Sequence, residues 1–191
     1  EGRLIRLDDR DLEMSRRHFP NQITSAIPTV NQDGVIASYG THYINSASMV
    51  GVYPEYAASQ AVEILEGRFI NIMDMTEKRK VCVMGSNSCK DLFKEGGSVI
   101  GRNVKLGGIL YTVVGKYKTD EMFSSSNFYV PYTTLCTIYN KGRFIDELTM
   151  NTQNIPTDSA MEQFMKEYTR ATSYIHSFDP TDDRALWIWN Q

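Results

Sequence analysis

Both ends of the chain carry the same order of expected elements, and this repeated order restricts the possible folds more than any other feature. Residues 3–30 predict a strand, a helix over 9–19 and a second strand. Residues 144–178 predict a strand, a helix from Pro156 to about residue 172, and a closing strand at Tyr174 to Phe178. Two units of this kind can share one sheet in a split β-α-β layout.

The middle of the chain has strands and helices of its own. A two-residue hairpin is predicted at Gly107-Gly108, because both glycines accept positive φ between two strand-like runs. We therefore expect an α+β fold with two lobes. One lobe, 1–48 with 141–191, is built from both chain ends, and a small α/β lobe, 49–140, is inserted between them.

The composition is that of an ordinary globular protein, and it excludes some classes of binding partner. The 191 residues are 41% hydrophobic and 23% charged, so the chain can bury a core. The net charge is −3 and no basic stripe is present, which argues against nucleic acid and against an anionic lipid surface. No apolar run approaches the roughly 18–20 residues that span a bilayer. The chain begins Glu1-Gly2-Arg3, and we expect it to be a piece of a longer protein.

The three cysteines are interpreted as small core residues. An odd number cannot form a closed disulfide framework. Cys82 lies in the apolar run Val81 to Met84, which predicts a buried strand, and Cys89 and Cys136 lie in amphipathic helical patterns.

The turn from Met84 to Cys89 follows a predicted strand and opens a predicted helix, where a phosphate loop or a nucleophile would lie. It matches neither GxxxxGK[ST] nor GxGxxG, and it lacks the second glycine of GxSxG. Ser86 or Asn87 is therefore interpreted as a helix cap. In the last helix, Ser159 and Glu162 fit a capping box.

The remaining polar residues do not predict a metal, cofactor or catalytic site. No histidine has a ligand partner at a recognised spacing; the histidines are His18, His42 and His176. The acidic group at 179–183 lacks the glycine and terminal glutamate of an EF-hand loop. A Ser/His/Asp assembly from distant segments, in a free-standing hydrolase, stays open as a distant alternative.

Five blocks in the middle of the chain resemble the MacB-like periplasmic core domain of ABC transporter permeases, an FtsX-like permease family. In order, the blocks are Gly51 to Tyr56, Leu65 to Phe69, Val81 to Gly85, Ile100 to Gly115 and Val130 to Thr134. The shared residues are mostly glycines and prolines at turns, strand ends and helix starts. Those we single out are Gly51, Pro54, Gly67, Arg68, Gly85, Gly101, Gly115 and Pro131. None is a nucleophile, a base or a ligand, so the blocks specify a fold and no reaction.

The resemblance implies a role in a bacterial inner-membrane transporter. It implies a periplasmic domain whose terminal lobe is porter-like and whose inserted lobe is Sabre-like, flanked in the parent protein by transmembrane helices. ATP hydrolysis would belong to a separate cytoplasmic domain, and its conformational change would reach this domain through the membrane. The resemblance also implies a homodimer, a periplasmic adaptor and an outer-membrane duct for efflux. A lipoprotein-releasing or FtsX-type regulatory permease is the alternative.

One loop is a candidate contact for such a partner. Residues 119–127 are polar and rich in serine, with Met122 and Phe123 embedded in them. Apolar residues in a polar loop often mark interaction sites. The alternative is that both side chains pack back between the lobes.

Overall fold

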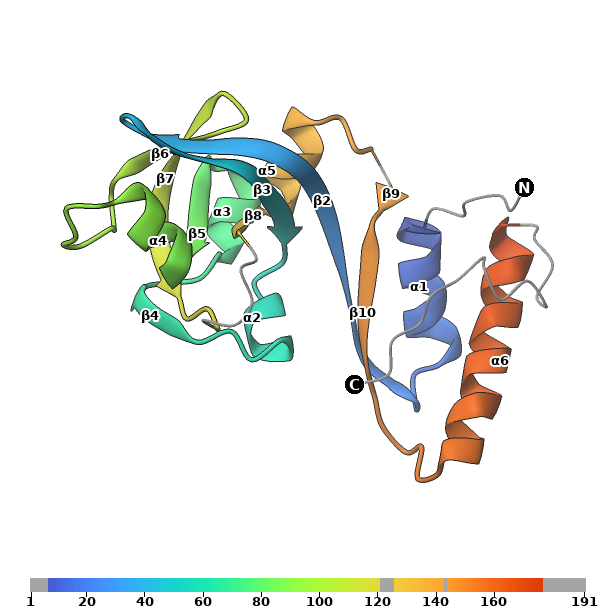
Figure 1. Cartoon of the computed structure of the whole chain (residues 1–191). Helices are drawn as coiled ribbons and strands as arrows, with labels where there is room; N and C mark the ends of the chain where they lie inside the picture. The colour runs from blue at the N-terminus through green and yellow to red at the C-terminus, as the bar shows by residue number, and fades with distance from the viewer. Residues whose placement is uncertain (1–6, 121–125, 143, 177–191) are drawn as a thin grey trace. The chain divides into compact units, whose positions relative to one another are not determined.

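The computed structural model describes residues 7–120, 126–142 and 144–176, and it has a mixed α/β fold, as predicted (Figure 1). The chain divides into two compact units. The first contains Glu1–Pro28 with Arg143–Gln191, and the second contains Thr29–Gly142. Within the described ranges, no helix has both the length and the apolar character needed to cross a membrane.

The first unit boundary lies at residue 28, about twenty residues before the position expected from the sequence. The reason is the pairing of β2 (Ile23–Tyr39) with β3 (His42–Val52), which runs antiparallel from Val30↔Gly51 to Tyr39↔His42. This ladder joins the segment after residue 28 to the second unit. The strand predicted to end at residue 30 continues to Tyr39, with register irregularities after Gln32 and a positive φ of 67° at Gly34.

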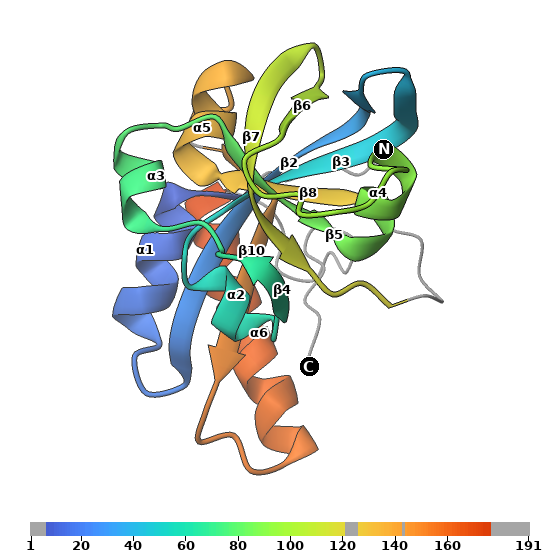
Figure 2. The same cartoon turned by 90° about the vertical axis from the view of Figure 1, so that its left-hand side faces the viewer.

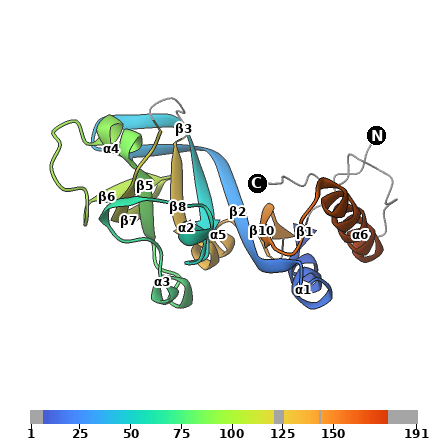
Figure 3. The ribbon, with the colours of Figure 1, turned by 90° about the horizontal axis from the view of Figure 1, so that it is seen from below.

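The first unit combines two helices with short strands. Its elements are β1 (Leu7–Asp8), α1 (Asp9–His18), the start of β2, β9 (Phe144–Ile145), β10 (Glu147–Thr152) and α6 (Asp158–His176). β1 pairs antiparallel with β9, and β10 neighbours β2. Helix α1 begins where predicted, because Asp8 caps it and Asp11 completes the capping box. Helices α1 and α6 lie side by side (Figures 1 and 3).

Aromatic residues form the core of the first unit. Phe19 contacts Phe164 edge to face with ring centroids 5.5 Å apart, and it also contacts Tyr168 at 5.7 Å. The buried Tyr168 hydroxyl hydrogen-bonds Ser15 Oγ at 2.7 Å, so its polar end is satisfied inside the core. Met14 and Ile23 are buried in the same cluster.

Helix α6 is longer than the sequence predicts. The strand expected at Tyr174 to Phe178 is wrong for Tyr174 to His176, which continue the helix, and residues 177–178 lie outside the described ranges. Thr172, just before this segment, is fully buried and its hydroxyl donates to the Tyr168 carbonyl one turn back, and Ile175 within the segment packs against the core of the first unit. Burial on this helical face therefore overrides the strand propensity of the final residues.

The start of α6 also differs in detail. The capping box predicted at Ser159 does not form there, because Thr157 Oγ1 accepts the Ala160 N–H at 3.1 Å. The Thr157 carbonyl then accepts the first helical bond, from Met161 N–H. The cap lies two residues earlier than expected, with the same chemistry.

Strand pairings in the second unit close into a ring. Besides β2 and β3, its strands are β4 (Ile64–Gly67), β5 (Val81–Gly85), β6 (Asn103–Leu106), β7 (Ile109–Tyr117) and β8 (Asn127–Pro131). The pairings run β2–β3–β8–β5–β7–β6 and return to β2 (Figure 2). β3–β8 and β5–β7 are parallel, and β4 adds to the second half of β7.

Short helices and an apolar core complete the second unit. The helices are α2 (Tyr56–Ser59), α3 (Ile72–Thr76), α4 (Ser86–Leu92) and α5 (Tyr132–Ile138). The predicted hairpin is confirmed, since Leu106 pairs with Ile109 and the two glycines between them have φ of 57° and 84°. Fully buried side chains include Met49, Met84, Leu92, Leu106, Tyr111, Phe128 and Leu135. Leu92 at the end of α4 and Phe93 directly after it are both buried in this core.

Candidate functional site

Two of the family-like blocks meet where β4 passes β7, and glycines make the approach possible. Gly67 pairs with Gly115, and the Arg68 N–H donates to the Val114 carbonyl at 2.9 Å. A Cβ atom on Gly115 would lie 2.0 Å from the Arg68 carbonyl oxygen, and one on Gly67 would lie 2.2 Å from the Val114 oxygen. Gly67 also has a φ of 73°, which glycine adopts most readily. This close contact fixes where the Arg68 side chain begins.

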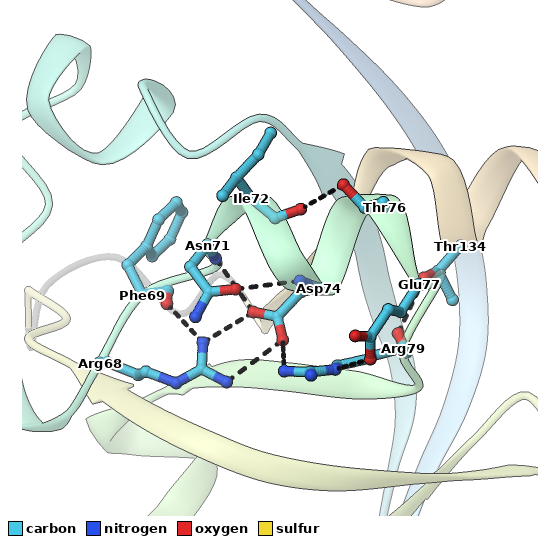
Figure 4. Close-up of polar contacts among 9 residues, drawn as sticks. All are labelled: Arg68, Phe69, Asn71, Ile72, Asp74, Thr76, Glu77, Arg79 and Thr134. Carbon is cyan, nitrogen blue, oxygen red and sulfur yellow. Dashed lines mark hydrogen bonds and ion pairs between the residues drawn. The ribbon is translucent and has the colours of Figure 1, made fainter.

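Arg68 leads into a network centred on the buried carboxylate of Asp74 (Figure 4). The Asp74 side chain is fully buried, and Arg68 donates to it from both terminal nitrogens at 2.7 and 3.2 Å. Asp74 and Asn71 form a reciprocal capping box at the start of α3, with bonds of 2.9 and 3.0 Å. Arg79 Nη1 lies 3.5 Å from Asp74 Oδ1, the oxygen that also accepts the longer Arg68 bond. Every oxygen of this carboxylate therefore has a donor.

The network decides the charge of Asp74. Burial by itself would raise the pKa of Asp74, but the Arg68 hydrogen bonds, the Asn71 N–H and the charge of Arg68 outweigh it, with a further contribution from Arg79. The net result is a pKa below the ordinary 3.8. A carboxylate that is ionised and fully bonded is a poor general base, because no lone pair is left to take a proton. Its role is to hold the turn between β4 and β5.

The same network presents an apolar surface. Helix α5 holds the far end of α3, since Thr133 donates to the Met75 carbonyl at 2.5 Å and Thr134 donates to the Arg79 carbonyl at 2.8 Å. On the outer side of α3, Ile72 is 67% exposed and Met73 is 48% exposed. A five-residue helix is thus held rigidly from within while two large apolar side chains face outward. Sequence reasoning missed this helix, although the Asn71-x-x-Asp74 spacing is a readable capping signal.

The turn between β5 and α4 has no catalytic arrangement of the kind tested from the sequence. Gly85, not Ser86 or Asn87, is the N-cap residue, and it makes no side-chain cap bond. The capping oxygen comes from Thr119, whose Oγ1 accepts the Asn87 N–H at 3.1 Å. Ser86 Oγ pairs with the same Thr119 Oγ1 at 2.8 Å and accepts the Thr119 N–H. The interpretation of Ser86 or Asn87 as the cap is therefore wrong, because a distant residue supplies it.

The candidate contact residues Met122 and Phe123 lie outside the described residues. The chain on either side of them is well anchored within the second unit. On one side Thr119 bonds Ser86, and on the other the Ser126 carbonyl accepts the Ser48 N–H at 2.9 Å. The next carbonyl, of Asn127, accepts the Tyr117 hydroxyl at 2.7 Å.

The other singled-out residues have structural positions. A Cβ on Gly51 would lie 2.7 Å from Val30 Cγ2, and one on Gly85 would lie 2.5 Å from Thr119 Cγ2. Gly101 has a φ of 85°. Pro131 is the N-cap residue of α5, and Pro54 opens the turn before α2.

The cysteines lie in structural surroundings. Cys82 is fully buried and Cys89 nearly so, while Cys136 is half-buried. Burial raises the pKa of both buried thiols, that of Cys89 to about 11. They are therefore protonated at neutral pH and poor nucleophiles.

One histidine has a partner that sequence spacing could not reveal. His176 Nε2 lies 2.7 Å from Asp11 Oδ2, a residue 165 positions earlier, and Asp8 lies beside them in the first unit. A metal-ligand spacing in the sequence involves only residues close together in the chain, so it does not reveal the group of Asp8, Asp11 and His176.

Comparisons with known proteins return one family. A family model described as the MacB-like periplasmic core domain matches residues 2–171. A macrolide export ATP-binding/permease protein MacB from Shewanella oneidensis is 29% identical over 126 residues, which cover 62% of this chain and 19% of that protein. The protein of the same name from Mannheimia succiniciproducens is 22% identical over 149 residues, covering 76% of this chain and 23% of that protein. The chain thus spans about a fifth of the length of these relatives.

Solved structures show the same fold at low identity. The periplasmic region of MacB from Actinobacillus actinomycetemcomitans matches with a TM-score of 0.73 and 21% identity, covering 91% of this chain and 76% of that one. The extracellular domain of the noncanonic ABC-type transporter YknZ from Gram-positive bacteria matches with a TM-score of 0.74 and 16% identity, covering 92% and 87%.

Proposed function

Because the chain belongs to the family of MacB-like periplasmic core domains, and is thus the periplasmic domain of a MacB-like ABC transporter permease, we propose that it transmits ATP-driven conformational change to substrate export. The observation that carries this proposal is the extent of the family match, which covers residues 2–171 and so includes both compact units. The whole domain, and not one motif, has the organisation of the family.

The proposal assigns no chemistry to the domain itself. The polar groups around Arg68, a residue of the family-like blocks, are bonded to one another, since the Asp74 carboxylate accepts from Arg68, Asn71 and Arg79. Such a network maintains shape. ATP hydrolysis then belongs to another part of the parent protein, which fits the short share of the ATP-binding/permease relatives that the chain covers.

The partners in this proposal are a second copy of the permease, a periplasmic adaptor and an outer-membrane duct. The loop with Met122 and Phe123 is the proposed adaptor contact. What supports it is the anchoring on both sides, at Thr119 and at Ser126, which would give the two apolar residues a fixed base on the second unit. Apolar contacts on a fixed base lose less conformational entropy on binding.

The test uses the full-length permease with its adaptor. We expect Met122→Glu with Phe123→Glu to abolish co-purification of the adaptor and substrate export, while basal ATP hydrolysis is retained. The matched control is Ile72→Glu with Met73→Glu, which charges two exposed apolar residues elsewhere in the same unit. If the loop variant keeps both adaptor binding and export, the contact proposal is wrong. If both double variants lose them equally, the effect is not specific to the loop.

A lipoprotein-releasing or FtsX-type regulatory permease is the second candidate. It is supported by the similar fold of an extracellular domain from Gram-positive bacteria, which have no outer membrane to hold a duct. The neighbouring genes discriminate the two. An adaptor gene beside the permease gene favours efflux, and a permease–ATPase pair without one favours the alternative.

A further inference from the structure

A buried group of ionisable side chains lies in the first unit, whereas the family-like blocks belong to the second. Asp8 and Asp11 come from the start of α1, and His176 comes from the last described turn of α6. One ligand-type atom from each residue lies within 4.8 Å of the others. Asp11 is fully buried, Asp8 is 3% exposed, and the His176 side chain is 9% exposed.

Helix capping explains only part of this group. Asp8 caps α1, and Asp11 Oδ2 accepts the Asp8 N–H at 2.8 Å. The capping box accounts for neither the histidine nor the second oxygen of Asp11. That oxygen, Oδ1, is buried and has no hydrogen-bond partner among the described residues. A buried carboxylate oxygen without a donor is costly, and such an atom calls for an ion or a water beside it.

Charge balance favours a cation over a neutral hydrogen-bond donor such as water. Two carboxylates lie in the group, and Arg10 neutralises one of them by donating to Asp8 Oδ2 at 2.8 Å. The Asp11 carboxylate accepts the Asp8 N–H and lies 2.7 Å from the imidazole of His176, so the partners of its Oδ2 are a backbone amide and an imidazole. A cation bound between the two would compensate the Asp11 charge and provide the missing partner for its free oxygen.

We propose that Asp8, Asp11 and His176 form a binding site for a divalent transition-metal ion, with Zn²⁺ as the best match. One imidazole nitrogen with carboxylate oxygens and no thiolate is a donor set that suits Zn²⁺ or Mn²⁺, whereas Mg²⁺ and Ca²⁺ take oxygen ligands. Metal–ligand bonds of about 2.0–2.2 Å place two ligands of one ion up to about 4.4 Å apart, close to the observed spacing. The 2.7 Å contact of His176 with Asp11 opens when the ion enters between them.

The bound ion would fasten the end of α6 to the start of α1. It would act as a structural clip in the first unit, because its ligands come from two different helices, Asp8 and Asp11 from the start of α1 and His176 from the end of α6. This inference is independent of the transport proposal, because it concerns the metal content of the isolated chain.

The experiment is a calorimetric titration of Zn²⁺ into untagged protein that has been stripped with a chelator. We expect one equivalent to bind, and His176→Gln to weaken binding by at least about 100-fold, because even outer-shell substitutions cost about 10- to 100-fold. The matched control is His42→Gln, which removes an exposed histidine of the second unit and should leave binding unchanged. Mg²⁺ should give no saturable binding.

A second variant guards against loss of folding. Arg10→Gln frees the Asp8 carboxylate from its competing guanidinium, and we expect it to tighten Zn²⁺ binding, a gain that misfolding cannot produce. Absence of saturable Zn²⁺ binding, or unchanged binding in His176→Gln, overturns the proposal. Unchanged affinity in Arg10→Gln removes Asp8 from the ligand set and overturns the three-ligand site.

Discussion

Removing Arg68 tests whether the Asp74 network holds the inserted unit together. Arg68→Met keeps most of the apolar stem and deletes the two charged hydrogen bonds to the buried Asp74. Losing one partner of a buried ion pair typically costs about 3–5 kcal/mol, because the remaining charge is uncompensated. Here Arg68 is 41% exposed and both Arg79 and the Asn71 N–H remain, so solvent screening reduces the expected loss to about 2 kcal/mol.

The assay is urea unfolding followed by circular dichroism, with hydrogen exchange of the 68–79 backbone to locate the loss. Arg79→Met is the matched control, since Arg79 lies 3.5 Å from Asp74 and should cost about half as much or less. Adding Asp74→Asn to Arg68→Met should recover part of the stability, because the uncompensated charge disappears. The reasoning is refuted if Arg68→Met unfolds within about 0.5 kcal/mol of the unchanged protein, the range of ordinary surface substitutions.

Three further outcomes follow from the same structure. The Asp74 pKa is lowered on folding, so the contribution of Asp74 to stability is complete above its ordinary pKa of 3.8 and is lost as pH falls through the pKa of the folded state. The urea midpoint of Asp74→Asn should therefore fall less steeply in acid than that of the unchanged protein. Equal slopes would contradict this. Gly115→Ala should destabilise by at least about 2–3 kcal/mol in urea unfolding, because its Cβ would meet the Arg68 carbonyl, whereas Gly108→Ala should cost only about 1 kcal/mol for its positive φ. In alkylation at pH 8 monitored by mass spectrometry, Cys136 should react first and Cys82 and Cys89 only after unfolding; early labelling of Cys89, whose pKa is about 11, would contradict its burial.

Local patterns predicted those elements whose causes are local. The hairpin at Gly107-Gly108 formed as expected because two adjacent positive-φ residues between strands leave few other choices. Helix α1 begins where the sequence predicts it, and the capping box of Asp8 and Asp11 that fixes its start lies within four residues. The motif glycines were singled out by the resemblance of their blocks to a known family, and the close contact of Gly115 with Arg68 is visible only in three dimensions.

Features that depend on distant residues were missed or misplaced. The cap of α4 comes from Thr119, more than thirty residues away. The sequence around the start of the helix therefore indicated Ser86 or Asn87 as the N-cap. The segment from Tyr174 that was expected to be a strand continues helix α6, on which Tyr168 and Thr172 are buried in the first unit. Strand propensities of single residues do not include such tertiary burial. The unit boundary at residue 28 follows from the β2–β3 ladder, whose length depends on pairing and not on composition.

Asp74 and Asp11, two of the buried carboxylates, differ in whether their oxygens already have hydrogen-bond donors. Asp74 is ionised, and its oxygens receive donors from Arg68, Asn71 and Arg79, so a ligand would have to displace bonds that the fold already makes. Asp11 is equally buried, yet one of its oxygens has no donor in the described chain and its nearest counter-group is an imidazole. The first arrangement is complete without a ligand and the second is not. A new binding function in this domain is therefore expected at Asp11, and substitutions at Asp74 are expected to change stability without changing any bound ion.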